Sequence, residues 1–237
     1  MSMLPYISDQ DFLREVRHIL DVAQSAMDAS DEQIYANVID PFSAVVDAMR
    51  QDVSISDWLR LERARQIQKT MQNELGNFHQ RVLGSVDGWE DLGTGSVLDL
   101  VNNDKKIIAE VKNKHNTTKG NHKREIYEDL SSRINSSHKG YVGYYVEIIR
   151  KAKHPFDKPF TPPDNRTNKH MPTNKSIRKI DGRSFYALAT GIPNAIDLLY
   201  EALPHAISKI LNIPNDGVIE DPSYIDLFQR AYPETRK

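Results

Sequence analysis

The spacing of the apolar residues changes once along the chain, near residue 84. Before that point apolar side chains recur every three or four residues, which is typical of helices that bury one face. The pattern predicts a helix over residues 8–30, a second from about Asp31 that Pro41 breaks or restarts, and a long third helix over residues 56–83, capped by Ser56. We therefore expect a helical N-terminal region.

Beyond residue 84, short apolar runs lie between glycine, asparagine and aspartate residues, which is typical of strands. They predict a short strand between Gly88 and Gly93 and a hairpin formed by residues 96–101 and 106–112. A helix at 121–135 and a strand at 139–149 should follow. The alternation of strands and helices predicts an α/β fold.

In the C-terminal third of the chain, the spacing of the apolar residues predicts fewer elements. Residues 185–190 read as one more strand, ended by Gly191, and a helix should begin near Pro193. Pro204 lies inside that helix and should kink or divide it, because proline has no backbone N–H to donate. The expected organisation is thus a helical region at 1–55, a core at 56–192 and a helical segment at 193–237, within one compact domain.

Charged residues interrupt both strands of the predicted hairpin. A two-residue turn at Asn103-Asp104 would pair Asn102 with Lys105 and set Asp99 opposite Ile108. Because strand side chains alternate, one face is then wholly apolar and should be the core. That face holds Leu98, Leu100, Ile107, Ala109 and Val111. The opposite face holds Val97, Asp99, Val101, Lys106, Ile108, Glu110 and Lys112.

The charged face suits phosphodiester hydrolysis. Two carboxylates on one face repel each other unless a cation lies between them, and Mg²⁺ accepts one or two carboxylate oxygens together with water and substrate phosphate. Asp99 and Glu110 are therefore candidate ligands for one or two Mg²⁺ ions, and Lys112 is placed to assist the attacking water. The alternative is an exposed strand face with incidental charges.

Composition narrows the class of protein. The chain has 237 residues, 39% of them hydrophobic, and no cysteine, so thiolate metal sites and cysteine nucleophiles are excluded. Its N-terminus lacks a basic segment followed by an apolar one, and no apolar stretch approaches membrane-spanning length. We expect a cytoplasmic protein without membrane contact.

The charge is segregated along the chain, although the formal net charge is only −2. The segment from Lys112 to Arg183 carries 17 basic and 7 acidic residues, which leaves 14 basic and 26 acidic residues elsewhere. Clustered lysine and arginine neutralise phosphates, so this segment indicates a nucleic-acid partner. The alternative is a solvated, lysine-rich loop.

These residues carry a resemblance to a known family. Asp99, then Glu110-Val111-Lys112 on the next strand, resemble the core of the PD-(D/E)XK nuclease superfamily, whose element order is α-β-β-β-α-β. The resemblance covers residues 56–149, with Leu98 in place of the usual proline. The stretches EVKNKHNTTKGN at 110–121 and IDGRSFYALATG at 180–191 are similar to type II restriction endonucleases that cut GGNCC.

The resemblance implies a further ligand on the long helix, for which Glu74 is the candidate; the alternative is an ordinary solvated glutamate. It also implies a nuclease core of a mixed sheet flanked by helices.

Two polar segments are the candidate DNA contacts. The first follows the catalytic strand and comprises Asn113, Lys114, His115, Asn116, Thr117, Thr118 and Lys119. His115 could instead be a general base. The second is the proline-rich segment 150–183, read as a recognition loop ordered only on DNA or, alternatively, as a disordered insertion. Its candidate contacts are Arg166, Lys169, Lys175, Arg178 and Lys179.

Together the residues and the resemblance predict a Mg²⁺-dependent type II restriction endonuclease that acts on double-stranded DNA as a homodimer. A methyltransferase of the same specificity would protect host sites. The alternatives are a repair or recombination nuclease of the same fold and a DNA-binding module without catalysis.

Overall fold

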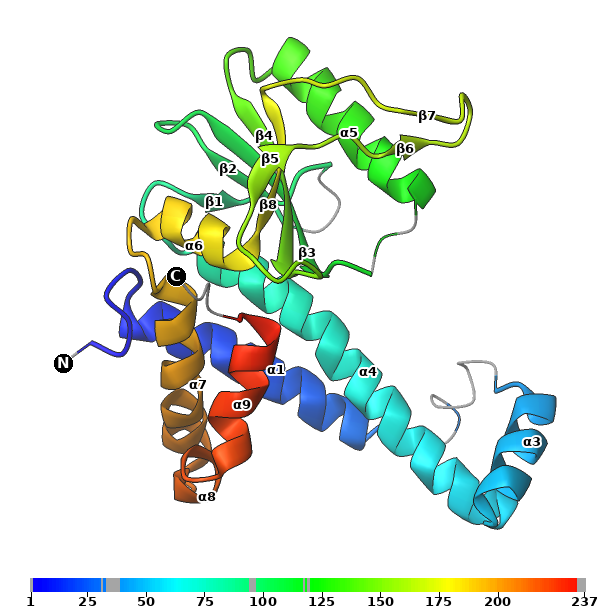
Figure 1. Ribbon diagram of the computed structural model, residues 1–237. Helices are drawn as coiled ribbons and strands as arrows, with labels where there is room; N and C mark the ends of the chain where they lie inside the picture. The colour runs from blue at the N-terminus through cyan, green and yellow to red at the C-terminus, as the bar shows by residue number, and fades with distance from the viewer. Residues whose placement is uncertain are drawn as a thin grey trace. The chain divides into compact units, whose positions relative to one another are not determined.

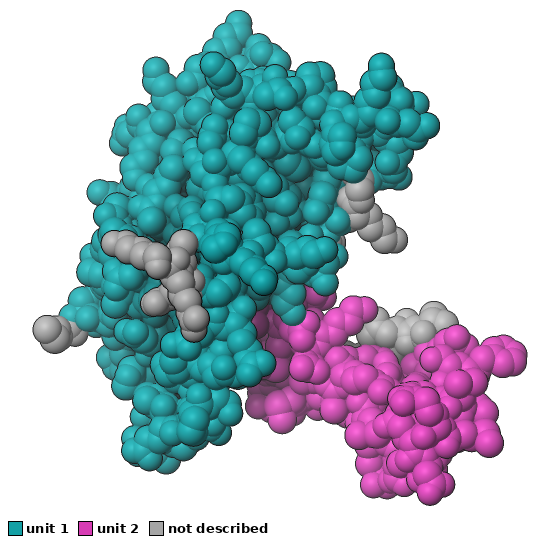
Figure 2. Space-filling view, viewed as in Figure 1, with its two compact units in different colours: residues 1–16, 76–237 teal, residues 17–75 magenta. Residues whose placement is uncertain are grey.

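The computed structural model describes residues 2–30, 32, 39–93, 97–116, 118 and 120–233. Contacts divide the chain into two compact units, coloured separately in Figure 2. Unit 1 comprises Met1–Val16 and Gly76–Lys237, and unit 2 comprises Arg17–Leu75. The division at 1–55, 56–192 and 193–237 stays a prediction about domains.

A six-stranded mixed sheet forms the centre of unit 1 (Figure 1). Its strand order is β1 (Glu90–Asp91), β2 (Leu100–Asn102), β3 (Ile107–Lys114), β4 (Val142–Ile149), β8 (Ile177–Asp181) and β5 (Asp157–Pro159). Strands β3, β4 and β8 run parallel, whereas β1, β2 and β5 are joined by antiparallel pairing. With α4 (Ile55–Gly84) before β1 and α5 (Gly120–Asn135) before β4, the predicted order α-β-β-β-α-β is confirmed.

Helices cover both faces of this sheet (Figure 1). On one face α5 buries Ile126, Tyr127 and Leu130 against the sheet residues Val101 and Ile108. On the other lies α6 (Gly182–Thr190), whose Phe185 ring packs 5.9 Å from that of Tyr144. The prediction of a single apolar core face is therefore wrong, because α5 also buries the apolar residues of the face that carries the charges.

The hairpin register differs from the prediction by two residues. Leu100 pairs with Ala109 and Asn102 with Ile107, so the turn spans four residues instead of two. The side chain of Asn102 accepts a hydrogen bond from Lys105 N at 2.8 Å, and Lys106 adopts a positive φ of 53°, which together favour the longer turn. A shift of two residues keeps every side chain on its predicted face.

The expected loop at 150–183 contains regular structure. It holds β5, the small two-stranded sheet of β6 (Pro163–Asp164) and β7 (Lys169–His170), and β8, which lies inside the main sheet. The prediction of a loop without regular structure is thus wrong, whereas a dependence of its order on DNA stays a prediction. Strand β8 is only five residues long, so it has too few apolar residues to show the two-residue period of a strand in the sequence.

The predicted strand at 185–190 is wrong as well, because these residues form α6. Asp181 ends β8 and caps the helix by accepting hydrogen bonds from Ser184 N at 3.3 Å and from the Ser184 hydroxyl at 2.8 Å. Gly182 lets the helix start close to β4, where an added Cβ would meet Ile148 Cα at 2.7 Å.

The remaining helices largely follow the predictions. They are α1 (Asp9–Met27), α3 (Pro41–Gln51), α7 (Ala195–Leu211), α8 (Asp216–Ile219) and α9 (Pro222–Ala231). Pro41 starts α3, as the predicted restart requires, and Ser54, not Ser56, caps α4 by accepting from Asp57 N at 3.1 Å. The predicted helix start at Asp31 lies outside the described residues. In the part of the chain that is described, no helix is both long and apolar enough to cross a membrane.

Pro204 does not divide α7, which runs through it as one helix. The proline deprives the carbonyl of Tyr200, four residues earlier, of its helical partner. The Tyr224 hydroxyl of α9 donates to that carbonyl at 2.8 Å instead. The prediction of a division fails because a neighbouring helix supplies the missing donor.

Candidate active site

The antiparallel pairing of β2 and β3 brings the two carboxylates together. Leu100 pairs with Ala109, and Asp99 N donates to Ala109 O at 3.1 Å, so Asp99 lies just before β2 at the position opposite Glu110. Its Oδ2 accepts a hydrogen bond from Val111 N at 2.6 Å. This bond fixes the Asp99 side chain against the neighbouring strand.

Lys112 completes the group. Its Nζ lies 2.6 Å from Glu110 Oε1 and 3.8 Å from Asp99 Oδ2. The side chains of Lys112, Asp99 and Glu110 retain 26%, 17% and 14% exposure, so all three are held by the sheet yet reachable from solvent. The structure thus brings together the three residues that the sequence predicts to share one face.

The electrostatics of the group leave negative charge poorly compensated. Burial, with the Asp99 carboxylate beside it, raises the pKa of Glu110 to about 7. Burial also raises the pKa of Asp99, outweighing the opposite effect of Lys112. For Lys112, burial works to lower the pKa, but Glu110 and Asp99 together outweigh it and the pKa is raised. A cation bound between the two carboxylates would favour their ionised forms.

The donor set fits a Mg²⁺ ion. Asp99 and Glu110 offer two carboxylates from neighbouring strands, and Mg²⁺ typically takes one or two carboxylates and fills its remaining positions with water and substrate phosphate. Within the described ranges, no group of three or more histidine, aspartate or glutamate side chains is placed to hold a metal ion. Two carboxylates would supply only part of the coordination shell of Mg²⁺.

Other polar residues surround this pair. Gln80 of α4 donates through Nε2 to Asp91 Oδ1 at 2.7 Å and to Asp99 O at 3.5 Å, and the Asp91 carboxylate is one of the charges that raise the pKa of Asp99. Glu147 lies in β4 beside Lys112. Glu147 is absent from the predicted site residues, although its signal is the same as that of Glu110: a carboxylate inside an apolar strand.

Glu74 belongs to unit 2, where its carboxylate Oε1 lies 3.5 Å from His18 Nε2. The residue is buried, at 7% exposure, so the solvated interpretation is wrong. Its role as a further ligand stays a prediction.

The polar segment after Lys112 is partly strand. Asn113 and Lys114 are the last residues of β3, and His115 and Asn116 form the turn that follows. Thr118 is buried, at 6% exposure. Thr117 and Lys119 lie outside the described residues. DNA contact by this segment stays a prediction.

The five basic residues predicted in segment 150–183 lie in different settings. Lys169 in β7 and Lys175 in a turn are exposed, as is Arg166, whose Nη1 lies 3.8 Å from Glu128. Arg178 Nε bonds Asp157 Oδ1 at 2.6 Å. Lys179 shares the face of Glu110, whereas Arg178 points to the opposite face.

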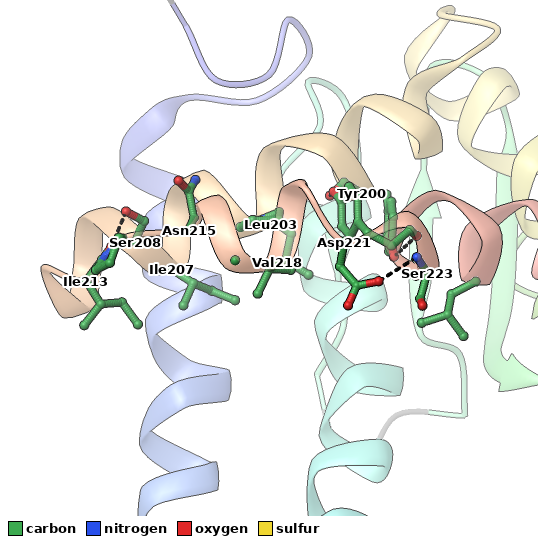
Figure 3. Close-up of a pocket in the computed structure, with 14 residues that line it drawn as sticks. Tyr200, Leu203, Ile207, Ser208, Ile213, Asn215, Val218, Asp221 and Ser223 are labelled. Carbon is green, nitrogen blue, oxygen red and sulfur yellow. Dashed lines mark hydrogen bonds between the residues drawn. The ribbon is translucent and has the colours of Figure 1, made fainter.

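A separate pocket of about 420 Å³ lies among α7, α8 and α9 (Figure 3). Apolar side chains, among them Leu203, Ile207 and Val218, form most of its lining. None of these helices carries the two carboxylates or Lys112, so this pocket is separate from the candidate active site.

Comparison with known proteins identifies relatives along almost the whole chain. The model of the Eco47II restriction endonuclease family matches residues 4–212. The type II restriction enzyme Eco47II of Escherichia coli is 42% identical over 239 residues, which cover 98% of this chain and all of the relative. The type II restriction enzyme Sau96I of Staphylococcus aureus is 27% identical over 237 residues, covering 98% of this chain and 89% of the relative. No solved structure matches the chain.

Proposed function

The chain belongs to the Eco47II restriction endonuclease family, and from that membership we propose that it is a type II restriction enzyme whose cleavage is carried out by Asp99, Glu110 and Lys112. The observation that carries the proposal is the convergence of these three side chains at the end of one hairpin. The mixed sheet flanked by helices agrees with a PD-(D/E)XK core.

Each residue has a role that follows from its position. Asp99 and Glu110 would hold Mg²⁺, which supplies charge stabilisation for the phosphate when bound. Lys112 keeps its proton, because both carboxylates favour the charged ammonium, and it can orient the attacking water and stabilise negative charge that develops on the phosphate. Glu74 is proposed as a further ligand, as the family resemblance implies.

The proposed substrate is double-stranded DNA with a short palindromic site, GGNCC. The two segments that we expect to contact it are residues 113–119 and the basic side chains of 150–183. A DNA methyltransferase of the same specificity is expected to protect host sites without binding this enzyme. We expect the enzyme to act in the cytoplasm, where bacterial DNA lies.

We also propose that the active form is a homodimer. One chain carries one group of Asp99, Glu110 and Lys112, which can hydrolyse one strand at a time. A palindromic site reads the same on both strands, so a two-fold dimer supplies one group for each strand.

Incubation of the purified protein with plasmid DNA, with Mg²⁺ or with EDTA, tests the proposal. Discrete fragments that require Mg²⁺ are the expected result. Nicking at structural irregularities alone would indicate a repair nuclease, and retention of DNA without cutting would indicate a binding module.

A further inference from the structure

A second group of polar side chains lies beside the catalytic residues, on the same face of the sheet. The register places Tyr145 of β4 next to Glu110, and Lys179 of β8 next to Tyr145. It also places Glu147 next to Lys112. Paired residues on neighbouring strands share a face. Lys179 is therefore two strands away from Glu110, about 10 Å at the ordinary strand spacing.

Glu147 is shared between two lysines. Its carboxylate Oε1 lies 2.8 Å from Lys179 Nζ and 3.5 Å from Nζ of Lys123, which projects from α5. The Glu147 side chain is buried at 2% exposure, whereas Lys179 and Lys123 keep 22% and 21%. One buried carboxylate thus faces two partly exposed ammonium groups. We call Lys123 and Lys179 the lysine pair.

The lysine pair has more positive charge than its surroundings compensate. Burial lowers the pKa of Lys179, and the charges of Lys123 and Lys158 act in the same direction although Glu147 opposes them. Lys158 of β5 is the strand neighbour of Lys179 and is exposed. A bound anion would relieve this repulsion.

A spare hydrogen-bond donor lies next to Glu147. The Tyr145 hydroxyl is buried and makes no hydrogen bond of normal geometry with the described residues, although Glu147 and Thr118 lie near it. Burial raises the pKa of this phenol, so it stays protonated and can donate. Both ammonium groups lie against the Tyr145 ring, with Nζ of Lys123 5.9 Å and Nζ of Lys179 5.7 Å from its centroid.

We propose that Lys123 and Lys179 bind a backbone phosphate of the DNA next to the scissile phosphate. When they turn toward it, the Tyr145 hydroxyl donates to Glu147 in their place, so the buried carboxylate keeps a partner. The inference rests on the proposed endonuclease function, which identifies the anion as DNA. Without DNA, Glu147 holds both ammonium groups beside the face that carries Glu110, and it competes with the phosphate for them.

The test measures DNA affinity as a function of salt, in Ca²⁺ to prevent cleavage, for a duplex that the enzyme cuts in Mg²⁺ and for an unrelated duplex. The double variant Lys123→Gln/Lys179→Gln should lower the slope of log affinity against log salt by about 0.9, the contribution of one phosphate contact, and each single variant should lower it by part of that amount. At about 0.1 M salt the full change corresponds to a roughly tenfold weaker affinity, alike for both duplexes. Lys139→Gln, an exposed lysine before β4, is the matched control and should leave the slope unchanged.

Neutral phosphates locate the contact. A single methylphosphonate is moved along the strand one position at a time. The wild-type enzyme should bind the duplex more weakly when the methylphosphonate lies next to the cut. The variant with both lysines replaced should no longer sense that position. Glu147→Gln should tighten binding, because it leaves the lysine pair without its carboxylate, and Tyr145→Phe should weaken binding.

Folding and function can be separated in this design. Lys179→Gln leaves Glu147 with one ammonium group fewer, so the variant that also carries Glu147→Gln restores the wild-type sum of charges at the site. Circular dichroism checks that both variants are folded. In one contrary outcome, the enzyme cuts DNA while the lysine variants keep the wild-type salt slope and respond to each methylphosphonate as the wild type does. That result would overturn the proposed phosphate contact and leave the endonuclease function intact. If the enzyme cuts no DNA, the endonuclease fails, while the slope on unrelated duplex still reports on the lysine pair.

Discussion

Replacing the charged groups of Asp99, Glu110 and Lys112 should abolish cleavage without unfolding the protein. Asp99→Asn and Glu110→Gln preserve shape and remove one charge each, and Lys112→Met removes the ammonium group. We expect cleavage in Mg²⁺ to fall at least about a hundredfold, because each group acts on charge that develops in the transition state. Fragment formation from plasmid DNA gives the rate, and binding in Ca²⁺ should change far less, because phosphate contacts elsewhere hold the duplex.

The control for this series is Asp104→Asn, an exposed carboxylate in the turn of the same hairpin. It should cut at the wild-type rate. Glu110→Gln should not lower the metal-free stability, since burial makes its ionised carboxylate unfavourable in the fold. A catalytic variant that still cuts at the wild-type rate would remove that residue from the site.

His79 should make the stability of unit 1 depend on pH. It lies on α4 with Nδ1 2.9 Å from the Tyr186 hydroxyl, and burial lowers its pKa from 6.5 to about 4. Between these values the unfolded chain binds a proton that the folded chain does not. The contribution of His79 to the free energy of unfolding is therefore fully present above pH 6.5. It is lost as the pH falls toward 4, by up to about 3 kcal/mol.

Urea unfolding at a series of pH values between these limits measures the effect. His79→Gln should flatten the pH dependence, whereas His154→Gln, which changes an exposed histidine, should preserve it. If the free energy of unfolding depends on pH equally in wild type and His79→Gln, His79 accepts its proton as readily in the folded chain as in the unfolded one.

At the scale of residues, the sequence was sufficient to predict the face that carries Asp99, Glu110 and Lys112. It was insufficient to predict the polar residues beside that face. Asp99, Glu110 and Lys112 share a face in any register of the same parity, so an error of two residues in the turn did no harm. Lys123 and Glu147 come from an α-helix and a parallel strand that meet only in the folded chain. No sequence spacing shows that contact.

At the scale of elements, α7 and α9 should be coupled through Pro204. The Tyr224 hydroxyl donates to the Tyr200 carbonyl that the proline leaves without a helical partner. Tyr224→Phe should lower the free energy of unfolding by about 1 kcal/mol, the cost of a half-buried acceptor without its partner. In a Pro204→Ala background the helix supplies its own donor, so the same substitution should cost much less.

Urea unfolding of the four proteins in this double-mutant cycle measures the coupling. Tyr200→Phe is the matched control, because its hydroxyl donates to the Tyr224 carbonyl at 2.8 Å and has no link to the proline. Its cost should be the same in both backgrounds. If Tyr224→Phe costs as much with alanine at position 204 as with proline, the hydroxyl does not compensate for the proline.

The elements that the sequence predicted well are those with strong local signals, and those it missed depend on tertiary contacts. Helix α5 and strand β4 were found because each has a clear period and distinct ends. Strand β8 and helix α6 were not, because Asp181 both ends the strand and caps the helix. The aromatic residues of α6 favoured a strand locally, and packing of Phe185 under the sheet overrode that preference.

At the scale of the whole molecule, charge and apolar surface are distributed unevenly. The basic residues that the sequence concentrates after Lys112 lie in unit 1, where Lys123 and Lys179 share the catalytic face. Unit 2 instead carries an apolar stripe on α3, formed by Phe42, Val45, Val46 and Met49. These residues are spaced three or four apart and thus lie along one side of the helix, away from the buried Ala44 and Ala48.

We expect the α3 stripe to form the two-fold contact of the proposed dimer. Phe42 is 82% exposed and Met49 78%, an arrangement that a monomer in water rarely maintains. A helix stripe that packs on its own copy is self-complementary, as a two-fold interface requires. Sedimentation at micromolar concentration, with and without a cleavable duplex in Ca²⁺, should show a dimer for wild type and a monomer for Met49→Glu.

Leu227→Glu provides the matched control for this last experiment. Leu227 lies on α9, is 64% exposed and lines the C-terminal pocket, so the same charge is introduced on a different apolar surface. It should leave the dimer intact, and Met49→Glu should turn double-strand cleavage into slow nicking, because a monomer holds one catalytic group. Dissociation by Leu227→Glu alone would move the interface to the C-terminal helices. A wild-type protein that stays monomeric on DNA would instead mean that one chain cuts the two strands in succession.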